Sequence, residues 1–108
     1  MTIKEAQQQI DQWIQQYGGG YFSELTNMGI MTEEVGELAR WVVRKYGDQT
    51  LKPSEADTNI QEAIADEMTD ILWVLLCMAN QMNIDITTSL EKNIQKKTLR
   101  DSDRHIKS

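Results

Sequence analysis

The chain has 108 residues, 40% of them hydrophobic, which is enough for one domain with a modest core and too few for two. Its net charge of −6 at pH 7 argues against binding of a nucleic-acid polymer, because phosphate backbones require a basic surface. The chain starts without an apolar signal region, and its longest apolar run, residues 71–79, is too short to span a membrane. We therefore expect a cytoplasmic protein with a single domain over residues 1–108.

The first half of the chain predicts two helices separated by glycines. Thr2 and Glu5 have the spacing of a capping box, which opens a first helix that ends near Tyr17. The three glycines of residues 18–20 break this helix, and a second helix is predicted over residues 23–46. Apolar residues at three- and four-residue steps predict a buried stripe on the second helix: Met28, Met31, Val35, Leu38 and Val42.

A third helix is predicted after a loop at residues 48–57. Thr58 and Gln61 have the spacing of another capping box, and this helix is expected to end near residue 83. Residues 71–79 are apolar all round, which indicates burial on every side, either at the centre of the domain or against another subunit.

A short fourth helix over residues 87–97 is predicted to complete the fold, with a basic tail beyond it. The predicted fold class is therefore all-α. We expect an antiparallel bundle of four to five helices that assembles through helix packing between subunits.

Two clusters of acidic residues lie on the second and third predicted helices. The second helix carries Glu33, Glu34 and Glu37, and the third carries Glu67 and Asp70. Side chains three or four residues apart share one face of a helix, so each cluster projects carboxylates in one direction. If the two helices pack side by side, four of these carboxylates converge on one point.

Such a cluster is a candidate site for a divalent cation. No basic residue lies between Lys52 and Lys92, so the second cluster has no partner on its own helix. Oxygen ligands alone suit Mg²⁺ or Mn²⁺, and the only histidine, His105, lies in the tail, which argues against zinc and against a di-iron bundle. The alternative is a solvated helix face, on which Arg40 is placed to pair with Glu37.

The order of the two acidic motifs resembles that of a known family. Residues 32–40 read Thr-Glu-Glu-Val-Gly-Glu-Leu-Ala-Arg, and residues 66–72 read Asp-Glu-Met-Thr-Asp-Ile-Leu. Together they resemble the Glu-Glu-x-x-Glu … Glu-x-x-Asp signature of MazG-like nucleotide pyrophosphohydrolases, and the likeness runs from about Gly20 to Arg104. The resemblance implies an all-α homodimer or dimer of dimers with active sites at subunit contacts. It also implies Mg²⁺-dependent hydrolysis of nucleoside triphosphates, NTP or dNTP, to the monophosphate and pyrophosphate.

The resemblance also assigns roles to residues of this chain. By motif position, the implied metal ligands are Glu34, Glu37, Glu67 and Asp70. Glu33 matches the first motif position and is expected to orient or activate a water molecule. Asn93 and Lys97 match an Asn and a Lys on the last helix of some members, and with Arg100 they are candidates for substrate binding. Independently of the resemblance, the only concentrated positive charge of the chain lies in this region, which adds Lys92, Lys96 and Arg104 as candidates for phosphate contacts.

The basic segment has an equally good alternative, in which it pairs with the acidic body of the protein or with a second subunit. Trp41 lies four residues after Glu37 and is the tryptophan best placed to stack on a substrate base. Trp73 lies in the apolar run and is expected in the core, whereas Trp13 suits either packing at a helix edge or covering the site.

Two other functions compete with this hypothesis. The first is a non-catalytic helical dimer whose acidic faces bind a partner or a nucleotide. The second is a related pyrophosphatase that cleaves one metabolite, such as phosphoribosyl-ATP, on the same scaffold. Base and sugar preference depends on the shape of a pocket that the sequence alone does not specify.

Overall fold

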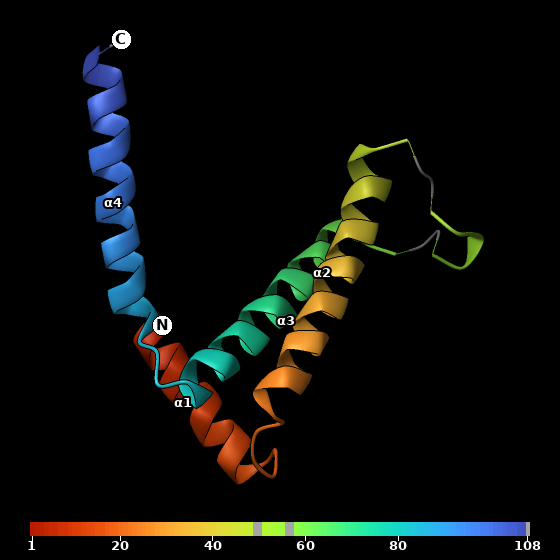
Figure 1. The fold of residues 1–108 in the computed structure, drawn as a ribbon. Coiled ribbons are helices and arrows are strands. Elements are labelled where there is room, and N and C mark those ends of the chain that lie inside the picture. The colour runs from red at the N-terminus through yellow and green to blue at the C-terminus, as the bar shows by residue number, and fades with distance from the viewer. Residues whose placement is uncertain (49–50, 56–57, 108) are drawn as a thin grey trace.

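The protein consists of helices joined by short connections (Figure 1). The computed structural model describes residues 1–48, 51–55 and 58–107. The elements, in chain order, are α1 (Ile3–Gln16), α2 (Glu24–Tyr46), the short 3₁₀ helix η1 (Pro53–Glu55), α3 (Ile60–Gln81) and α4 (Ile86–Lys107). No strand occurs within these ranges, which confirms the all-α prediction.

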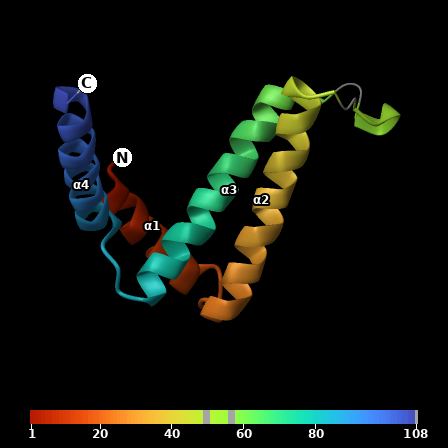
Figure 2. The same ribbon diagram turned by 45° about the horizontal axis from the view of Figure 1, so that its top comes forward.

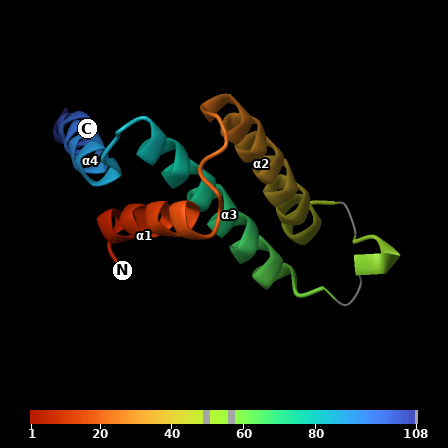
Figure 3. The ribbon, with the colours of Figure 1, turned by 90° about the horizontal axis from the view of Figure 1, so that it is seen from below.

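Helix α3 is the centre of the arrangement. It packs antiparallel to α2 along most of its length, and its C-terminal half also packs against α1 (Figures 1 and 3). Helix α4 contacts α1 and extends away from the α2–α3 pair, so that the chain has the outline of an open V (Figure 2). The radius of gyration is 17.9 Å, against about 13 Å for a compact domain of this size. One chain therefore does not close the predicted bundle by itself.

Side-chain caps at the helix N-termini satisfy backbone amides that have no partner within the helix. The predicted capping box of α1 is confirmed, because the Thr2 hydroxyl accepts from the Glu5 amide and the Glu5 carboxylate accepts from the Thr2 amide. For α3 the prediction was wrong by one residue. Asn59 is the N-cap, and its side-chain oxygen accepts from the Glu62 amide at 3.2 Å.

The glycine break is confirmed, and the predicted end of the last helix is wrong. Gly19 and Gly20 have φ angles of 72° and 101°, in the region that favours glycine, and they turn the chain from α1 to α2. Helix α4 does not stop at residue 97 but continues to Lys107. No glycine or proline follows residue 97, so nothing in the sequence ends the helix there.

The core lies between α1 and α3. Its buried centre consists of Ile10, Leu76 and Cys77, with Leu76 only 1% exposed. Beside it, the Asn80 side chain donates to the Gln7 carbonyl and to the Tyr21 hydroxyl, at 2.9 and 3.1 Å. These bonds connect α1, the turn after the glycines and α3.

Burial is less complete than the sequence pattern predicts. On α2, the side chains of Met28 and Val35 are about half exposed, so the predicted stripe is not a buried core of the single chain. On α3, Val74 and Leu76 are buried, but Leu72 is 51% exposed. Because α1 and α2 cover only part of α3, one apolar face of this helix stays open. No helix in the described ranges is both long and apolar enough to cross a membrane.

Candidate metal and nucleotide site

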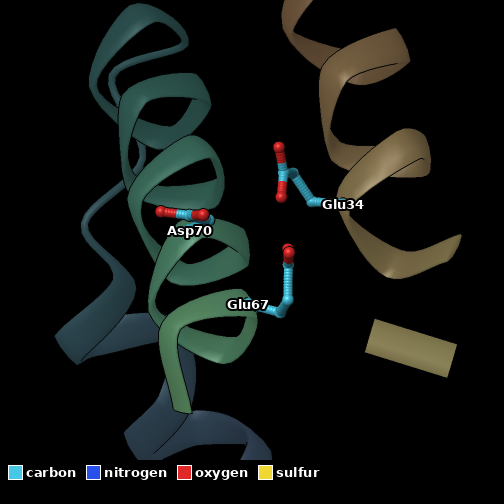
Figure 4. A group of neighbouring side chains, drawn as sticks. All are labelled: Glu34, Glu67 and Asp70. Atoms are coloured by element: carbon cyan, nitrogen blue, oxygen red, sulfur yellow. The ribbon is translucent and has the colours of Figure 1, made fainter. Parts of the chain in front are cut away.

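Three carboxylates from two helices converge between α2 and α3 (Figure 4). Glu34 comes from α2, and Glu67 and Asp70 come from α3. One carboxylate oxygen of each residue lies within 4.8 Å of the others. The structure thus brings together three of the four ligands that the resemblance implies.

Helix geometry explains which acidic residues meet. Glu67 and Asp70 are three residues apart and therefore share the face of α3 that is turned toward α2. On α2, Glu34 is directed toward this face (Figure 4). Glu33 is rotated by about 100° from Glu34 on the helix, and its side chain is exposed outside the group. Its expected action on a water molecule remains a prediction.

The three clustered carboxylates repel one another, and two of them have raised pKa values. A hydrogen bond with Glu34, burial and the charges of Glu34, Asp70 and Glu37 raise the pKa of Glu67 to about 7. Burial and the charges of Glu34 and Asp66 also raise the pKa of Asp70. Among the described residues, no lysine or arginine forms an ion pair with any of the three clustered groups.

The donor set fits a hard divalent cation. The Oε2 atom of Glu67 is buried and has no hydrogen-bond partner, an arrangement that is costly unless a ligand binds there. All the available ligand atoms are oxygens, the type that Mg²⁺ and Mn²⁺ prefer. Glu34, Glu67 and Asp70 could therefore hold such an ion.

Glu37, the fourth predicted ligand, lies outside this group. Its Oε2 atom is 3.5 Å from Nε of Arg40, so Glu37 forms the ion pair that was predicted as the alternative to metal binding. Arg40 also contacts Glu55 of η1, with 2.5 Å between Nη1 and Oε2. Sequence reasoning missed Glu55, because a pair that spans a loop leaves no helical spacing to detect.

The predicted phosphate-binding residues lie on α4, away from the carboxylates. Asn93, Lys97 and Arg100 are all exposed, and α4 diverges from α2 and α3 (Figures 1 and 2). Arg100 forms an ion pair with Asp101 at 3.0 Å. The side chain of Arg104 lies outside the described residues. A single chain does not bring these basic groups to the acidic cluster.

The tryptophans differ in accessibility. Trp41 is buried, and the Arg40 guanidinium lies 4.4 Å from the centre of its ring, so the structure does not favour stacking of Trp41 on a base. Trp73 packs against the core, as predicted. Trp13 is 48% exposed and packs edge to face against Trp73, with 5.4 Å between the ring centroids. This agrees with packing of Trp13 at the edge of a helix.

The fold and the acidic cluster define an all-α protein with a carboxylate site suited to a hard cation. The family model of the MazG nucleotide pyrophosphohydrolase domain matches residues 22–105. The chain therefore belongs to the MazG family and is a nucleotide pyrophosphohydrolase, a hydrolase of a family whose enzymes are in general metal-dependent.

Similar proteins occur in Bacillus. The chain is 40% identical over 103 residues to the uncharacterized protein YpjD of Bacillus subtilis, covering 95% of this chain and 89% of YpjD. A crystal structure of YpjD aligns with a TM-score of 0.75 at 38% identity over 89% of this chain and 94% of that one. The Bacillus-conserved MazG protein, a nucleotide pyrophosphohydrolase, aligns with a TM-score of 0.73, also at 38% identity, over 89% of this chain and 88% of that one.

Proposed function

We propose that this protein hydrolyses nucleoside triphosphates, ribo or deoxy, to the monophosphate and pyrophosphate, with Mg²⁺ held by Glu34, Glu67 and Asp70. Mn²⁺ is the expected substitute. The observation that supports this proposal most directly is the convergence of these carboxylates around the buried, unpaired oxygen of Glu67. Membership of a nucleotide pyrophosphohydrolase family supports the reaction class.

In the proposed reaction, a water oxygen bonds to the α-phosphorus and the bond to the α–β bridging oxygen breaks. Pyrophosphate leaves with the electron pair, and the water releases a proton. When bound, Mg²⁺ would neutralise phosphate charge and lower the pKa of a coordinated water. Glu67 must be ionised to act as a ligand, so metal binding is expected to displace any proton that it carries. Glu33 remains the candidate for orienting the attacking water.

The proposal includes assembly of the chain as a homodimer or a dimer of dimers. An apolar stripe on α3 supports it, because Met68, Leu72 and Leu75 are 56%, 51% and 40% exposed. The open outline of the single chain supports it too, since a partner would cover the faces that one chain leaves open. In such an assembly, Lys97 and Arg100 on α4 of one subunit would reach the carboxylate cluster of another subunit.

The test is product analysis after incubation of the purified protein with a panel of NTPs and dNTPs, with and without Mg²⁺. We expect monophosphate and pyrophosphate, with metal only. Replacing Glu34 with Gln or Asp70 with Asn should lower turnover by about 100-fold or more, because a metal contributes several kcal/mol to such reactions. Glu62→Gln, which removes an exposed carboxylate from the first turn of α3, is the matched control and should retain turnover.

Other products or substrates would change the proposed reaction or the proposed substrate. Diphosphate and phosphate would place the attack on a different phosphorus. Cleavage of phosphoribosyl-ATP with no turnover of the panel would identify a metabolite-specific enzyme. No turnover at all, together with no metal binding, would favour the non-catalytic helical dimer and refute the proposed site.

A further inference from the structure

Glu37 lies at the rim of the carboxylate cluster. It is three residues from Glu34 on α2, so the two side chains share one face of that helix. However, its carboxylate is paired with Arg40 at 3.5 Å, and its side chain is 53% exposed. Glu37 therefore lies one helical turn from a predicted ligand, and its carboxylate is held by the positive charge of Arg40.

Arg40 is anchored on its other side. Its Nη1 atom is 2.5 Å from Oε2 of Glu55, and its guanidinium lies over the ring of the buried Trp41. The side chains of Arg40 and Glu55 are only 27% and 15% exposed. The contact with Glu55 is thus shorter and better shielded from water than the contact with Glu37, which is the looser of the two.

The two carboxylates use different nitrogens of the guanidinium. Nε faces Glu37 and Nη1 faces Glu55, so Arg40 joins both acidic groups at once. A lysine has a single nitrogen and would not reproduce this bridge. The hydrogen bond from Arg40 also holds the pKa of Glu55 below its ordinary value, as expected for a carboxylate paired with a guanidinium.

We propose that Arg40 is a positioning residue that holds Glu37 at the rim of the metal site and competes with the cation for its carboxylate. Glu55 keeps the guanidinium in place when Glu37 turns toward the cation. The inference rests on the proposed metal site. It connects metal affinity to η1, a segment that contributes no ligand of its own.

The competition between Arg40 and the cation predicts whether each substitution raises or lowers metal affinity. Without the Arg40 guanidinium, Glu37 is free to join the cluster, so metal affinity should rise. Without the Glu55 carboxylate, Arg40 keeps Glu37 as its remaining acidic partner, so metal affinity should fall. Each change should be about two- to fivefold, because partly exposed ion pairs contribute up to roughly that much to an equilibrium.

The experiment is a calorimetric titration of the purified full-length protein with Mn²⁺ alone. Arg40→Gln, Arg40→Lys and Glu55→Gln are compared with the wild type, and each is also made in the Glu37→Gln background. We expect the changes in affinity with Glu37 present and none in its absence, and Arg40→Lys should behave like Arg40→Gln. Lys45→Gln removes a cation of α2 that contacts Gln61 instead of Glu37, so it controls for overall charge. Circular dichroism checks that each variant is folded.

Several results would overturn the inference. Equal effects of Arg40→Gln in both backgrounds would show only long-range charge, and so would an effect of the same size in Lys45→Gln. Wild-type affinity in Arg40→Lys would exclude the two-nitrogen bridge. These outcomes differ from failure of the proposed function, in which the wild type would show no Mn²⁺ binding that depends on Glu67.

Discussion

Replacing Glu67 with Gln should stabilise the metal-free protein at alkaline pH. The pKa of Glu67 is raised in the folded protein from its ordinary value of 4.5 to about 7, chiefly by the hydrogen bond with Glu34. A carboxyl group with a raised pKa favours folding while it is protonated, and this contribution is lost as the pH rises through about 7. The amide does not titrate, so the variant escapes this loss.

The raised pKa sets the size of the effect. A shift from 4.5 to about 7 corresponds to roughly 3.4 kcal/mol as an upper limit, at 1.36 kcal/mol for each pH unit. Asp70 is exposed to water and Glu67 is only partly buried, so solvent screening reduces the expected gain to about 1–2 kcal/mol. For a chain of this length, each 1 kcal/mol raises Tm by about 4 °C or somewhat more.

The assay is thermal unfolding of both proteins in a chelator, at pH 5 and pH 8 and at equal protein concentration. Glu67→Gln should exceed the wild type in Tm at pH 8 and lose this advantage at pH 5. Addition of Mg²⁺ at pH 8 should stabilise the wild type and have little effect on the variant. Glu62→Gln, which removes a carboxylate of α3 outside the cluster, is the control. Equal Tm differences from wild type at both pH values would refute the electrostatic reasoning.

Two further predictions concern the core and the assembly. Asn80→Ala should lower the free energy of unfolding by about 1–3 kcal/mol in urea titrations, because it removes the three part-buried hydrogen bonds that the Asn80 side chain makes with Gln7 and Tyr21. Gln12 is exposed, so Gln12→Ala should change the free energy of unfolding little. Equal effects of Asn80→Ala and Gln12→Ala would show that the hydrogen bonds of Asn80 do not stabilise the fold. Leu72→Glu should lower the mass measured by light scattering to that of one chain, because it places a charge on the open apolar face of α3. An unchanged oligomer would show that the interface lies elsewhere.

The sequence was informative wherever the decisive interactions are local. The capping box of Thr2 and Glu5 and the break at the glycines depend on neighbouring residues, and both predictions were confirmed. The pairing of Arg40 with Glu37 follows from a spacing of three residues on one helix. The motif itself indicated the family, and its spacing on two helices allowed a metal site to be predicted.

Only the tertiary structure decided which of these groups meet. It placed Glu34 opposite Glu67 and Asp70, left Glu37 with Arg40, and brought in Glu55 from a different element. Helical periodicity says which face of a helix a residue occupies, but it carries no information about which faces of other helices lie opposite. The same limit explains why apolar patterns on α2 and α3 predicted burial that one chain does not provide: a face of that kind is buried only where another helix covers it.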